Sequence, residues 1–387
     1  MPAMSSTTTV ILGGGVGGLV AAHRLRGSLP TRHRVILVER EARHVFAPSL
    51  LWVMTGQRSP ASITRPLAPL ARKGIEVLRG AVLGIDPARR AISVNGQTLT
   101  ADFLLVALGA DYAPEAVPGL ADAGPTFCTL PGAEGVKADL GHFRGGRIVV
   151  LTAAPQYKCP AAPYEAAMLI EASLRRRGLR ERSEIVLYAA EPGPMGVAGP
   201  AVSAAVREMV EAKGIQYRPS HQITSVSASA RRLSFSNGHE ASYDLLIHVP
   251  PHRAPAVARE AGLTSESGWV PVDRHSLATA FDRVYAVGDV TSIPLKLGKP
   301  LPKAGVFAHA QGEVVARNIA REITGRGTAA AFDGRGQCFV ETGDGRAGFG
   351  GGSFYAEPTP QITLRPPARH WHLGKVLFEK TWLWRSF

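Results

Sequence analysis

The 387-residue sequence has only three cysteines, Cys128, Cys159 and Cys338. Three cysteines so widely spaced form neither a disulfide scaffold nor a metal site. No apolar stretch approaches the ~20 residues that a membrane-spanning helix needs. The first residues also lack the charged and apolar segments of an ordinary secretory signal. We therefore expect a cytoplasmic chain whose cysteines are free, catalytic or redox-active.

Acidic residues are also scarce. The chain has 31 Asp and Glu against 44 Lys and Arg, which leaves a formal net charge of +13 at pH 7. Such a charge favours nucleic acid, acidic proteins or an anionic lipid surface as partners. We expect no nucleic-acid partner, because no zinc-knuckle spacing and no basic run with interleaved aromatics accompany the charge. A generally basic composition explains the charge equally well.

The clearest motif is a glycine-rich turn near the N-terminus. A β-branched apolar strand over residues 7–12 runs into Gly13, Gly15 and Gly18, and an apolar helix follows. The next predicted strand ends in Glu39, about 20 residues further on, where an acid accepts the ribose hydroxyls of a bound adenosine. The glycines let the backbone approach a pyrophosphate, and the helix N-terminus supplies partial positive charge. These residues predict a dinucleotide bound to a Rossmann-type fold.

Two later segments resemble the other fingerprints of the two-dinucleotide-binding-domain flavoproteins. An apolar strand ends in a small-residue turn that includes Ala107 and Gly109, and another ends in Gly288 and Asp289. The resemblance covers almost the whole chain. It implies that the dinucleotide is FAD, with Gly288 and Asp289 holding its pyrophosphate and ribitol.

A second glycine turn, which would bind a nicotinamide dinucleotide in that family, is missing. It should follow the predicted strand at 147–151, but residues 152–165 contain no glycine. Three prolines remove backbone donors there, and side chains fill the space that a pyrophosphate would need. Glu191 ends the next strand, but no glycine turn accompanies it. We therefore expect that a pyridine nucleotide is not the substrate.

The sequence around the cysteines resembles a narrower group. Residues 158–165 are similar to the Cys-Pro-x-Ala-Pro-Tyr-Glu segment of sulfide:quinone oxidoreductases and of the flavoprotein subunit of flavocytochrome c sulfide dehydrogenases. The resemblance implies that Cys159 pairs with a cysteine near the C-terminus, for which Cys338 is the candidate. Cys128 stands at the place of the third cysteine of the quinone-reducing enzymes.

The resemblance also implies a reaction. Hydrosulfide attacks a disulfide, or one bridged by extra sulfur, and yields a persulfide and a free thiolate; two electrons then pass to the flavin. Lys158 could favour a thiolate at Cys159. The alternative is that each cysteine is a small buried hydrophobic residue, as free cysteines often are.

Three charged residues match family positions. Glu165 lies where the family has an acid near the quinone, and such a group relays protons. Lys303 resembles a lysine close to flavin and quinone, and Lys375 a later lysine. Each could instead be a solvated surface charge. The chain departs from the family at Gly132 and at residues 195–197, where the quinone-reducing enzymes often have histidines.

These patterns predict an α/β chain with two Rossmann-like, glutathione reductase-like domains, the second inserted in the first. Residues 1–125 and 265–328 would form the FAD-binding domain, and residues 126–264 the second domain without the NAD glycine motif. Residues 329–387 would form a C-terminal region facing quinone and membrane. The length and a hydrophobic content of 45% suit such an organisation.

The last segment, 370–387, contains three of the five tryptophans. Its large apolar residues, interspersed with Lys and Arg, include Trp371, Leu373, Phe378, Trp382 and Phe387. This pattern suits a helix lying in the interface of an anionic membrane, and an amphipathic helix packed on the core is the alternative. Because a quinone dissolves in the membrane, we expect peripheral (monotopic) attachment, on the cytoplasmic side of the cell membrane.

The sequence thus favours an FAD-dependent sulfide:quinone oxidoreductase, with sulfide and a membrane quinone as substrates. A flavocytochrome c sulfide dehydrogenase subunit is disfavoured by Cys128 and by the expected absence of a signal. A type II NADH:quinone oxidoreductase is disfavoured by the glycine-free loop at 152–165. A flavin-binding module without activity would not need three matching cysteines. A homo-oligomer is left open.

Overall fold

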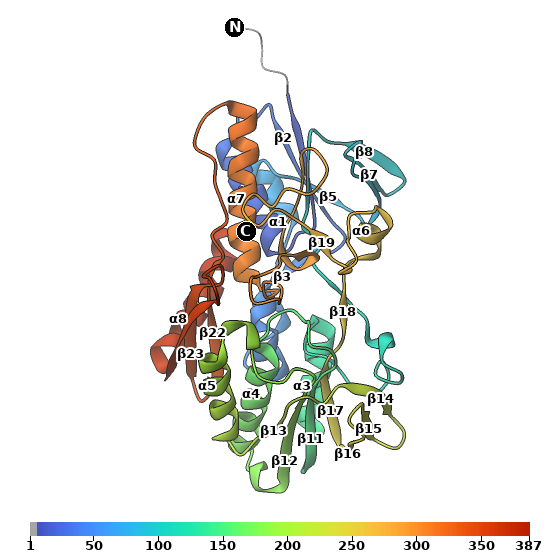
Figure 1. Ribbon diagram of the computed structural model, residues 1–387, viewed down its shortest axis with the longest axis vertical. Coiled ribbons are helices and arrows are strands. Elements are labelled where there is room, and N and C mark those ends of the chain that lie inside the picture. The colour runs from blue at the N-terminus through green and yellow to red at the C-terminus, as the bar shows by residue number, and fades with distance from the viewer. Residues whose placement is uncertain (1–5) are drawn as a thin grey trace.

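The computed structural model describes residues 6–387. Two α/β lobes lie one above the other along the long axis, and a small C-terminal sheet lies along one side (Figure 1). The chain starts in the first lobe, crosses to the second, returns to the first and ends in the C-terminal sheet and helix. The second lobe is therefore an insertion in the first, which confirms the predicted fold class. The exact domain limits stay a prediction.

The first lobe is built on a five-stranded parallel sheet in the order β20-β9-β1-β2-β5. Its strands are β1 (Thr8–Leu12), β2 (Arg34–Glu39), β5 (Glu76–Arg79), β9 (Phe103–Val106) and β20 (Val284–Ala286). The central strands are buried because layers cover both faces, as parallel sheets require. One face carries α1 (Val16–Ser28) and α7 (Gly305–Thr324). The other carries β6 (Val82–Asp86), β7 (Ala91–Val94), β8 (Gln97–Thr100) and α6 (Ala256–Glu260).

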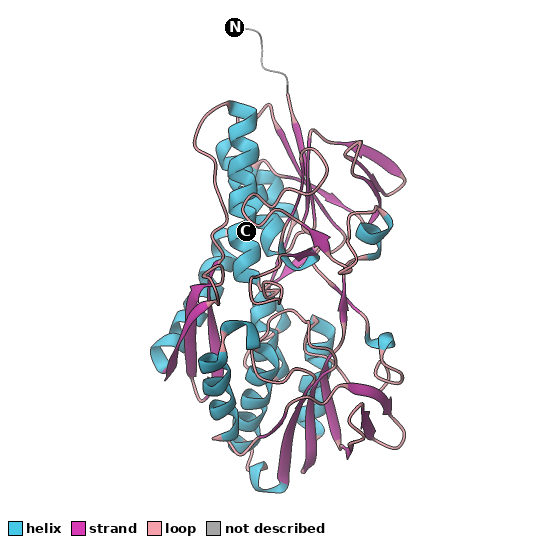
Figure 2. Cartoon of the chain, in the orientation of Figure 1, coloured by secondary structure: helices cyan, strands magenta, loops and turns pink. Residues whose placement is uncertain are grey.

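The second lobe repeats this plan with a four-stranded parallel sheet in the order β13-β12-β11-β17. Its strands are β11 (Gly146–Thr152), β12 (Ser183–Ala189), β13 (Gln216–Arg218) and β17 (Leu245–Val249). One face packs against α3 (Leu130–His142), α4 (Ala162–Arg176) and α5 (Pro200–Glu211). The other packs against an antiparallel layer of β14 (Ile223–Ser227), β15 (Arg232–Phe235) and β16 (Glu240–Ser242). Figure 2 shows both lobes as strands flanked by helices.

The C-terminal region is an antiparallel sheet followed by a helix. It comprises β22 (Arg335–Gly343), β23 (Arg346–Ser353), β24 (Gln361–Ala368) and α8 (Arg369–Arg385). The sequence predicted strands at the places of β22 and β23, but not β24, because Pro366 and Pro367 lie in it. Both prolines are tolerated because β24 is an edge strand that pairs only with β23.

Short elements complete the chain. They are α2 (Leu50–Met54) and the strand pairs β3 (Arg43–Val45) with β4 (Thr64–Pro66), β10 (Asp111–Tyr112) with β18 (His252–Arg253), and β19 (Val270–Pro271) with β21 (Thr291–Ser292). The β10–β18 pair lies where the chain leaves for the second lobe and returns from it. Among residues 6–387, no helix has the length and apolar character needed to cross a membrane.

A buried histidine connects the last helix to the glycine turn. His44 Nδ1 donates to the carbonyl of Gly14 at 3.0 Å, and Trp382 Nε1 of α8 donates to His44 Nε2 at 3.2 Å. Both ring nitrogens are thus used by a neutral imidazole with its proton on Nδ1. Burial lowers the pKa of His44 to about 4, although the bond to Gly14 acts in the opposite direction.

We expect the free energy of unfolding to fall as the pH falls from 6.5 to 4. Burial also lowers the pKa of His248 and His252 to about 4. Within this window the unfolded chain binds protons that the folded chain does not, so acid favours unfolding; below pH 4 these groups add no further loss. Urea denaturation at a series of pH values measures the slope.

The control is His44→Asn, which keeps a side-chain donor near Gly14 but does not titrate. Its slope should be shallower by up to about 1.4 kcal/mol per pH unit, the contribution of one proton. Identical slopes in the two proteins would show that His44 is not held neutral.

Candidate active site

The residues of the first predicted nucleotide site meet at one edge of the first sheet. Gly13 directly follows β1, Glu39 ends β2, Ala107 directly follows β9, and Gly288 comes shortly after β20. These strands are neighbours in the sheet and parallel, so their carboxyl ends lie side by side. Ligands of open α/β sheets bind at this edge. The structure therefore brings together residues as far apart in the sequence as Gly13 and Gly288, a separation of 275 positions.

The three glycines have different physical reasons for being glycine. Gly13 has φ +104°, and a Cβ on it would lie 2.4 Å from the carbonyl oxygen of Ala107. A Cβ on Gly18 would lie 1.9 Å from the carbonyl oxygen of Gly13. A Cβ on Gly15 would meet no protein atom within 4 Å. Gly13 and Gly18 thus permit the turn itself, whereas Gly15 faces open space at the start of α1.

This open space fits a pyrophosphate. Gly15 caps α1 without a side-chain hydrogen bond, so N–H groups of the first turn remain available to an anion. Beside it, Glu39 Oε2 accepts from the backbone N–H of Gly14 at 2.6 Å and Oε1 from that of Glu41 at 2.9 Å. The carboxylate is therefore fixed at the end of β2, where the ribose hydroxyls of an adenosine would bind. Gly109, with φ +72°, also has open space around its Cβ position.

The turn after β20 holds a lysine in a fixed position. Gly288 has φ +76°, and Lys303 Nζ donates to the carbonyls of Asp289 at 2.7 Å and Thr291 at 2.8 Å. The ammonium also lies 3.4 Å from the centroid of the Trp269 ring. Burial lowers the pKa of Lys303 to about 8, partly offset by the charge of Asp289. Lys303 is therefore not a solvated surface charge.

The structure brings Cys159 and Cys338 into one cluster, and both are free thiols here. Burial raises the pKa of Cys159 well above its ordinary value; charges on Glu165 and Cys338 raise it further, while Lys375 lowers it. Burial likewise raises the pKa of Cys338 to about 12, and Lys375 again acts in the opposite direction. Such mutual effects require the four groups to be close together. The Cys338 side chain is nevertheless exposed, so solvent can reach it.

Cys128 lies close to Tyr112 and to Lys158. Tyr112 donates its hydroxyl to the carbonyl of Cys128 at 2.7 Å, and Lys158 Nζ lies 4.4 Å from the centroid of the same ring. Burial raises the pKa of Cys128 to about 11, while a hydrogen bond with Thr126 and the charge of Lys158 act against it. Lys158 thus favours a thiolate at Cys128, and Lys375 takes the part at Cys159 that the sequence suggested for Lys158.

Behind the thiols lies a buried network of charges. Glu165 is 2% exposed, and its Oε1 accepts from Lys375 Nζ at 3.1 Å and from the backbone N–H of Glu341 at 2.8 Å. Burial would lower the pKa of Lys375, but the charges of Glu165 and Glu341 outweigh it and leave the pKa raised. His372 Nδ1 of α8 lies 3.0 Å from both carboxylate oxygens of Glu341. Glu165 and Lys375 are therefore not surface charges.

Sequence reasoning missed Glu341 and His372. Burial raises the pKa of Glu341, against the charges of Lys375 and His372. The sequence signal that could have identified Glu341 is its position three residues after Cys338 on the same strand. No such local pattern marks His372, which reaches the network only because α8 packs against β22 and β23.

In the second lobe, the position of the missing nucleotide site is filled by the chain itself. Glu191 is buried, and its Oε1 accepts from the hydroxyls of Tyr157 at 2.5 Å and Tyr164 at 2.7 Å. Its Oε2 accepts from Thr152 Oγ1 at 2.9 Å. Hydroxyls of the glycine-free loop and of α4 thus donate hydrogen bonds to the Glu191 carboxylate, which would otherwise be available to a ribose.

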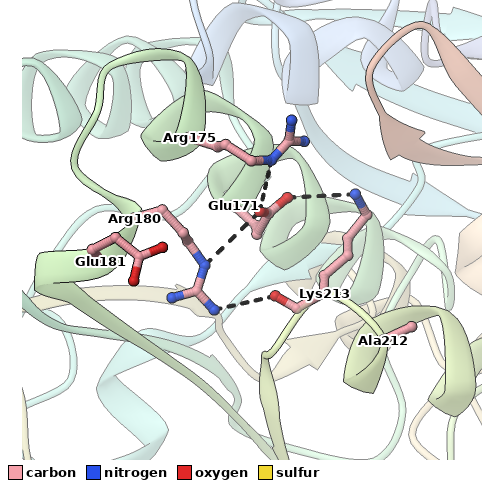
Figure 3. A pocket seen from close by; sticks show the side chains of 6 residues that line it. All are labelled: Glu171, Arg175, Arg180, Glu181, Ala212 and Lys213. Carbon is pink, nitrogen blue, oxygen red and sulfur yellow. Dashed lines mark hydrogen bonds and ion pairs between the residues drawn. The ribbon is translucent and has the colours of Figure 1, made fainter.

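An open pocket of about 470 Å³ lies elsewhere on the second lobe (Figure 3). It is lined by Glu171, Arg175, Arg180, Glu181, Ala212 and Lys213. The buried Glu171 carboxylate already pairs with Arg175 at 3.1 Å and Lys213 at 3.4 Å. These cations are therefore satisfied within the protein, and the pocket has none of the thiols or buried acids of the site above.

Residues 7–312 match the family described as pyridine nucleotide-disulphide oxidoreductase. The chain belongs to this family. Its members of the sulfide-quinone reductase type bind FAD, so this protein is an FAD-dependent oxidoreductase, and the glycine turn, Glu39 and the Gly288–Asp289 turn fit that cofactor.

Similar proteins include a sulfide-quinone reductase from Aquifex aeolicus. This oxidoreductase is 27% identical to it over 394 residues, which cover 97% of this chain and 90% of the relative. The mitochondrial sulfide:quinone oxidoreductase of Mus musculus is 24% identical, with 90% and 78% covered. Alternative NAD(P)H-ubiquinone oxidoreductase C1 of Arabidopsis thaliana is 25% identical, with 82% and 67% covered. The X-ray structure of the Aquifex aeolicus sulfide:quinone oxidoreductase shares the fold, with a TM-score of 0.90, 24% identity, and 98% and 91% covered.

Replacing Gly15 by alanine should weaken FAD binding and leave the apoprotein as stable as before. The methyl group has room within the protein but would occupy the space facing α1 that a pyrophosphate needs. We expect at least a tenfold higher Kd, about 1.4 kcal/mol of lost binding. Titration of the apoprotein with FAD, followed by flavin fluorescence, measures it.

Gly27→Ala is the matched control, because Gly27 lies in the same helix, is exposed, and also has no atom within 4 Å of its Cβ position. Its Kd should equal that of the unmodified protein. Equal FAD affinity in Gly15→Ala and Gly27→Ala would place the pyrophosphate elsewhere.

Proposed function

We propose that this oxidoreductase oxidises sulfide at Cys159 and Cys338 and reduces a membrane quinone. The observation that carries the proposal is the clustering of both thiols with the buried Glu165–Lys375 pair, together with a second nucleotide position closed by the chain's own side chains. The similarity to sulfide-quinone reductases over nearly the whole chain supports it.

The sulfur step needs a leaving thiolate. When Cys159 and Cys338 are joined by a disulfide, hydrosulfide attacks one sulfur and forms an S–S bond to it, while the original S–S bond breaks and releases the other cysteine as a thiolate. Burial raises the pKa of both thiols, and the positive charge of Lys375 acts in the opposite direction, so it stabilises whichever thiolate forms. Bound FAD would supply the two-electron carrier between the reduced sulfur and the quinone.

The quinone step needs protons as well as electrons. Glu165 and Lys375 form a buried pair that joins α4 to α8, and the raised pKa of Lys375 keeps it protonated at neutral pH. A quinone oxygen that gains charge near this pair would accept a proton from the Lys375 ammonium, which Glu165 and Glu341 hold in place. His372 is 21% exposed and next to Glu341, so it offers a route for replacing that proton from outside.

A membrane-dissolved quinone also requires that the enzyme contact a membrane, and α8 exposes apolar side chains that suit such a contact. Its buried face carries the polar Lys375 and Glu379 next to Trp382, while large apolar side chains point outward. The exposed ones are Leu373 (64% exposed), Leu377 (67%), Phe378 (46%) and Trp384 (77%). Trp382, which the sequence placed at the interface, is buried instead. We propose that this exposed apolar set enters an anionic lipid surface, attracted by the net charge of +13, on the cytoplasmic side.

A NAD(P)H:quinone reductase is the second candidate, because the Arabidopsis thaliana relative carries that name. The contacts of Glu191 disfavour it: a ribose would have to displace two tyrosine hydroxyls from a buried carboxylate. A flavocytochrome c sulfide dehydrogenase subunit remains a further alternative, and Cys128 beside Tyr112 disfavours it. A module without activity does not account for two cysteines beside a buried acid–lysine pair and a third beside Lys158.

Anaerobic mixing of the FAD-loaded protein with sulfide should bleach the flavin band, and mixing with NADH should not. In Cys159→Ala the sulfide-driven bleaching should slow by at least about 100-fold, because the S–S bond that hydrosulfide attacks cannot form. Rapid absorbance spectroscopy measures both rates. Bleaching by NADH alone, or full sulfide activity in Cys159→Ala, would overturn the proposed function.

Leu377→Asp should reduce binding to vesicles of anionic lipid, because it places a charge within the exposed apolar set of α8. The control is Leu83→Asp, which makes the same change at a residue that is 64% exposed but lies in the first lobe. We expect sedimentation with vesicles to fall several-fold for Leu377→Asp and to remain unchanged for Leu83→Asp. Equal sedimentation of the two variants would contradict an interface on α8.

A further inference from the structure

The loop that carries Cys159 is fastened on both sides of the cysteine to one buried carboxylate. Tyr157 lies two residues before Cys159, and Tyr164 lies in the first turn of α4, directly before Glu165. Both tyrosine hydroxyls donate to the same oxygen of Glu191, at 2.5 Å and 2.7 Å. Cys159 therefore lies between Tyr157 and Tyr164, which both bind Glu191 in the turn that follows β12.

Cys159 needs such fastening because its backbone is strained. Its φ is +57°, a left-handed conformation that is unfavourable for a non-glycine residue and persists only where the surroundings enforce it. One enforcing contact is the hydrogen bond from the Cys159 N–H to the carbonyl of Lys303 at 2.7 Å, which ties the loop to the first lobe. The other contacts are the two tyrosine hydroxyls on Glu191, which tie it to the second lobe.

The anchor itself is rigid. Glu191 Oε2 accepts from Thr152 Oγ1 at 2.9 Å, and the same Thr152 oxygen accepts from the N–H of Ala190 at 3.1 Å. Thr152 ends β11 and Ala190 directly follows β12, so the carboxylate is held between two neighbouring strands of the second sheet. Bonds from neutral hydroxyls to a carboxylate are stronger than bonds between neutral groups, and three of them converge here.

We propose that Glu191 is a positioning residue for the redox cysteines: through Tyr157 and Tyr164 it holds Cys159 in the strained conformation that faces Cys338 and Glu165. Glu191 stands where a nucleotide-binding lobe would have its ribose-binding acid. In this protein it instead positions a cysteine that reacts next to the FAD site of the first lobe. The effect on sulfide oxidation rests on the proposed function. The effect on the geometry of the Cys159–Cys338 pair does not, and it can be measured without sulfide.

The test compares Tyr157→Phe with Tyr217→Phe. Tyr157→Phe removes one hydrogen bond to Glu191 and keeps the ring. Tyr217→Phe makes the same change in a ring that packs 5.9 Å from that of Tyr164, but its buried hydroxyl makes no hydrogen bond to Glu191. A loss of packing or of stability alone would affect both variants, whereas a positioning role affects only the first.

The first readout is the equilibrium between the Cys159–Cys338 disulfide and mixtures of reduced and oxidised glutathione, with the products identified by mass spectrometry. We expect the equilibrium constant of Tyr157→Phe to shift at least tenfold toward the free thiols, and that of Tyr217→Phe to stay within twofold of the unmodified protein. Glu191→Gln, which keeps the shape but loses the charge, should shift it further. Where Glu191→Gln fails to fold, Tyr157→Phe carries the test.

The second readout is the anaerobic rate of flavin bleaching by sulfide, which should fall at least tenfold in Tyr157→Phe while the flavin spectrum stays unchanged. Equal equilibrium constants in Tyr157→Phe, Tyr217→Phe and the unmodified protein would overturn the positioning role. So would an unmodified protein in which no glutathione mixture produces the Cys159–Cys338 disulfide. If the glutathione equilibrium shifts as expected but sulfide bleaches no flavin in the unmodified protein, the proposed function fails and the positioning role stands.

Discussion

The buried ion pair between Glu165 and Lys375 is the contact on which the arrangement of this molecule depends. Two charges removed from water are unfavourable unless they meet each other and further hydrogen-bonding groups. That requirement draws α4 of the second lobe, β22 through the N–H of Glu341, and α8 to one point. Cys159 lies just before α4 and Cys338 lies on β22, so satisfying the charges also assembles the thiols.

The two lobes share one architecture and have diverged in what occupies the carboxyl edge of each sheet. In the first lobe, Gly15 leaves open space at the start of α1, and the Glu39 carboxylate lies where a ribose would bind. In the second, tyrosine and threonine hydroxyls satisfy the equivalent acid, Glu191, from within the chain. A buried carboxylate must have partners, and whether these come from a ligand or from the protein decides whether the lobe binds a nucleotide.

Local patterns were enough to predict much of this molecule and failed where distant segments meet. Strand periodicity and the glycine turn are features of short stretches of sequence, so the fold class and the FAD cofactor could be inferred, while the pairing of Cys159 with Cys338 stays a prediction. Adjacency in sequence misled at Lys158, because its ammonium lies over the ring of Tyr112 and acts on Cys128, whereas Lys375 acts on Cys159. The inward face of Trp382 was equally hidden, since it depends on a hydrogen bond to a histidine more than 300 residues away.

That hydrogen bond has a consequence for how the protein is made. Trp382 follows His44 by 338 residues, and through His44 it supports the carbonyl of Gly14. Chains fold from the N-terminus as they emerge from the ribosome, so the glycine turn is synthesised early and lacks this support until the last helix is released. A nascent chain that stops before Trp382 would therefore carry the glycine turn for a flavin without the contact that supports the Gly14 carbonyl.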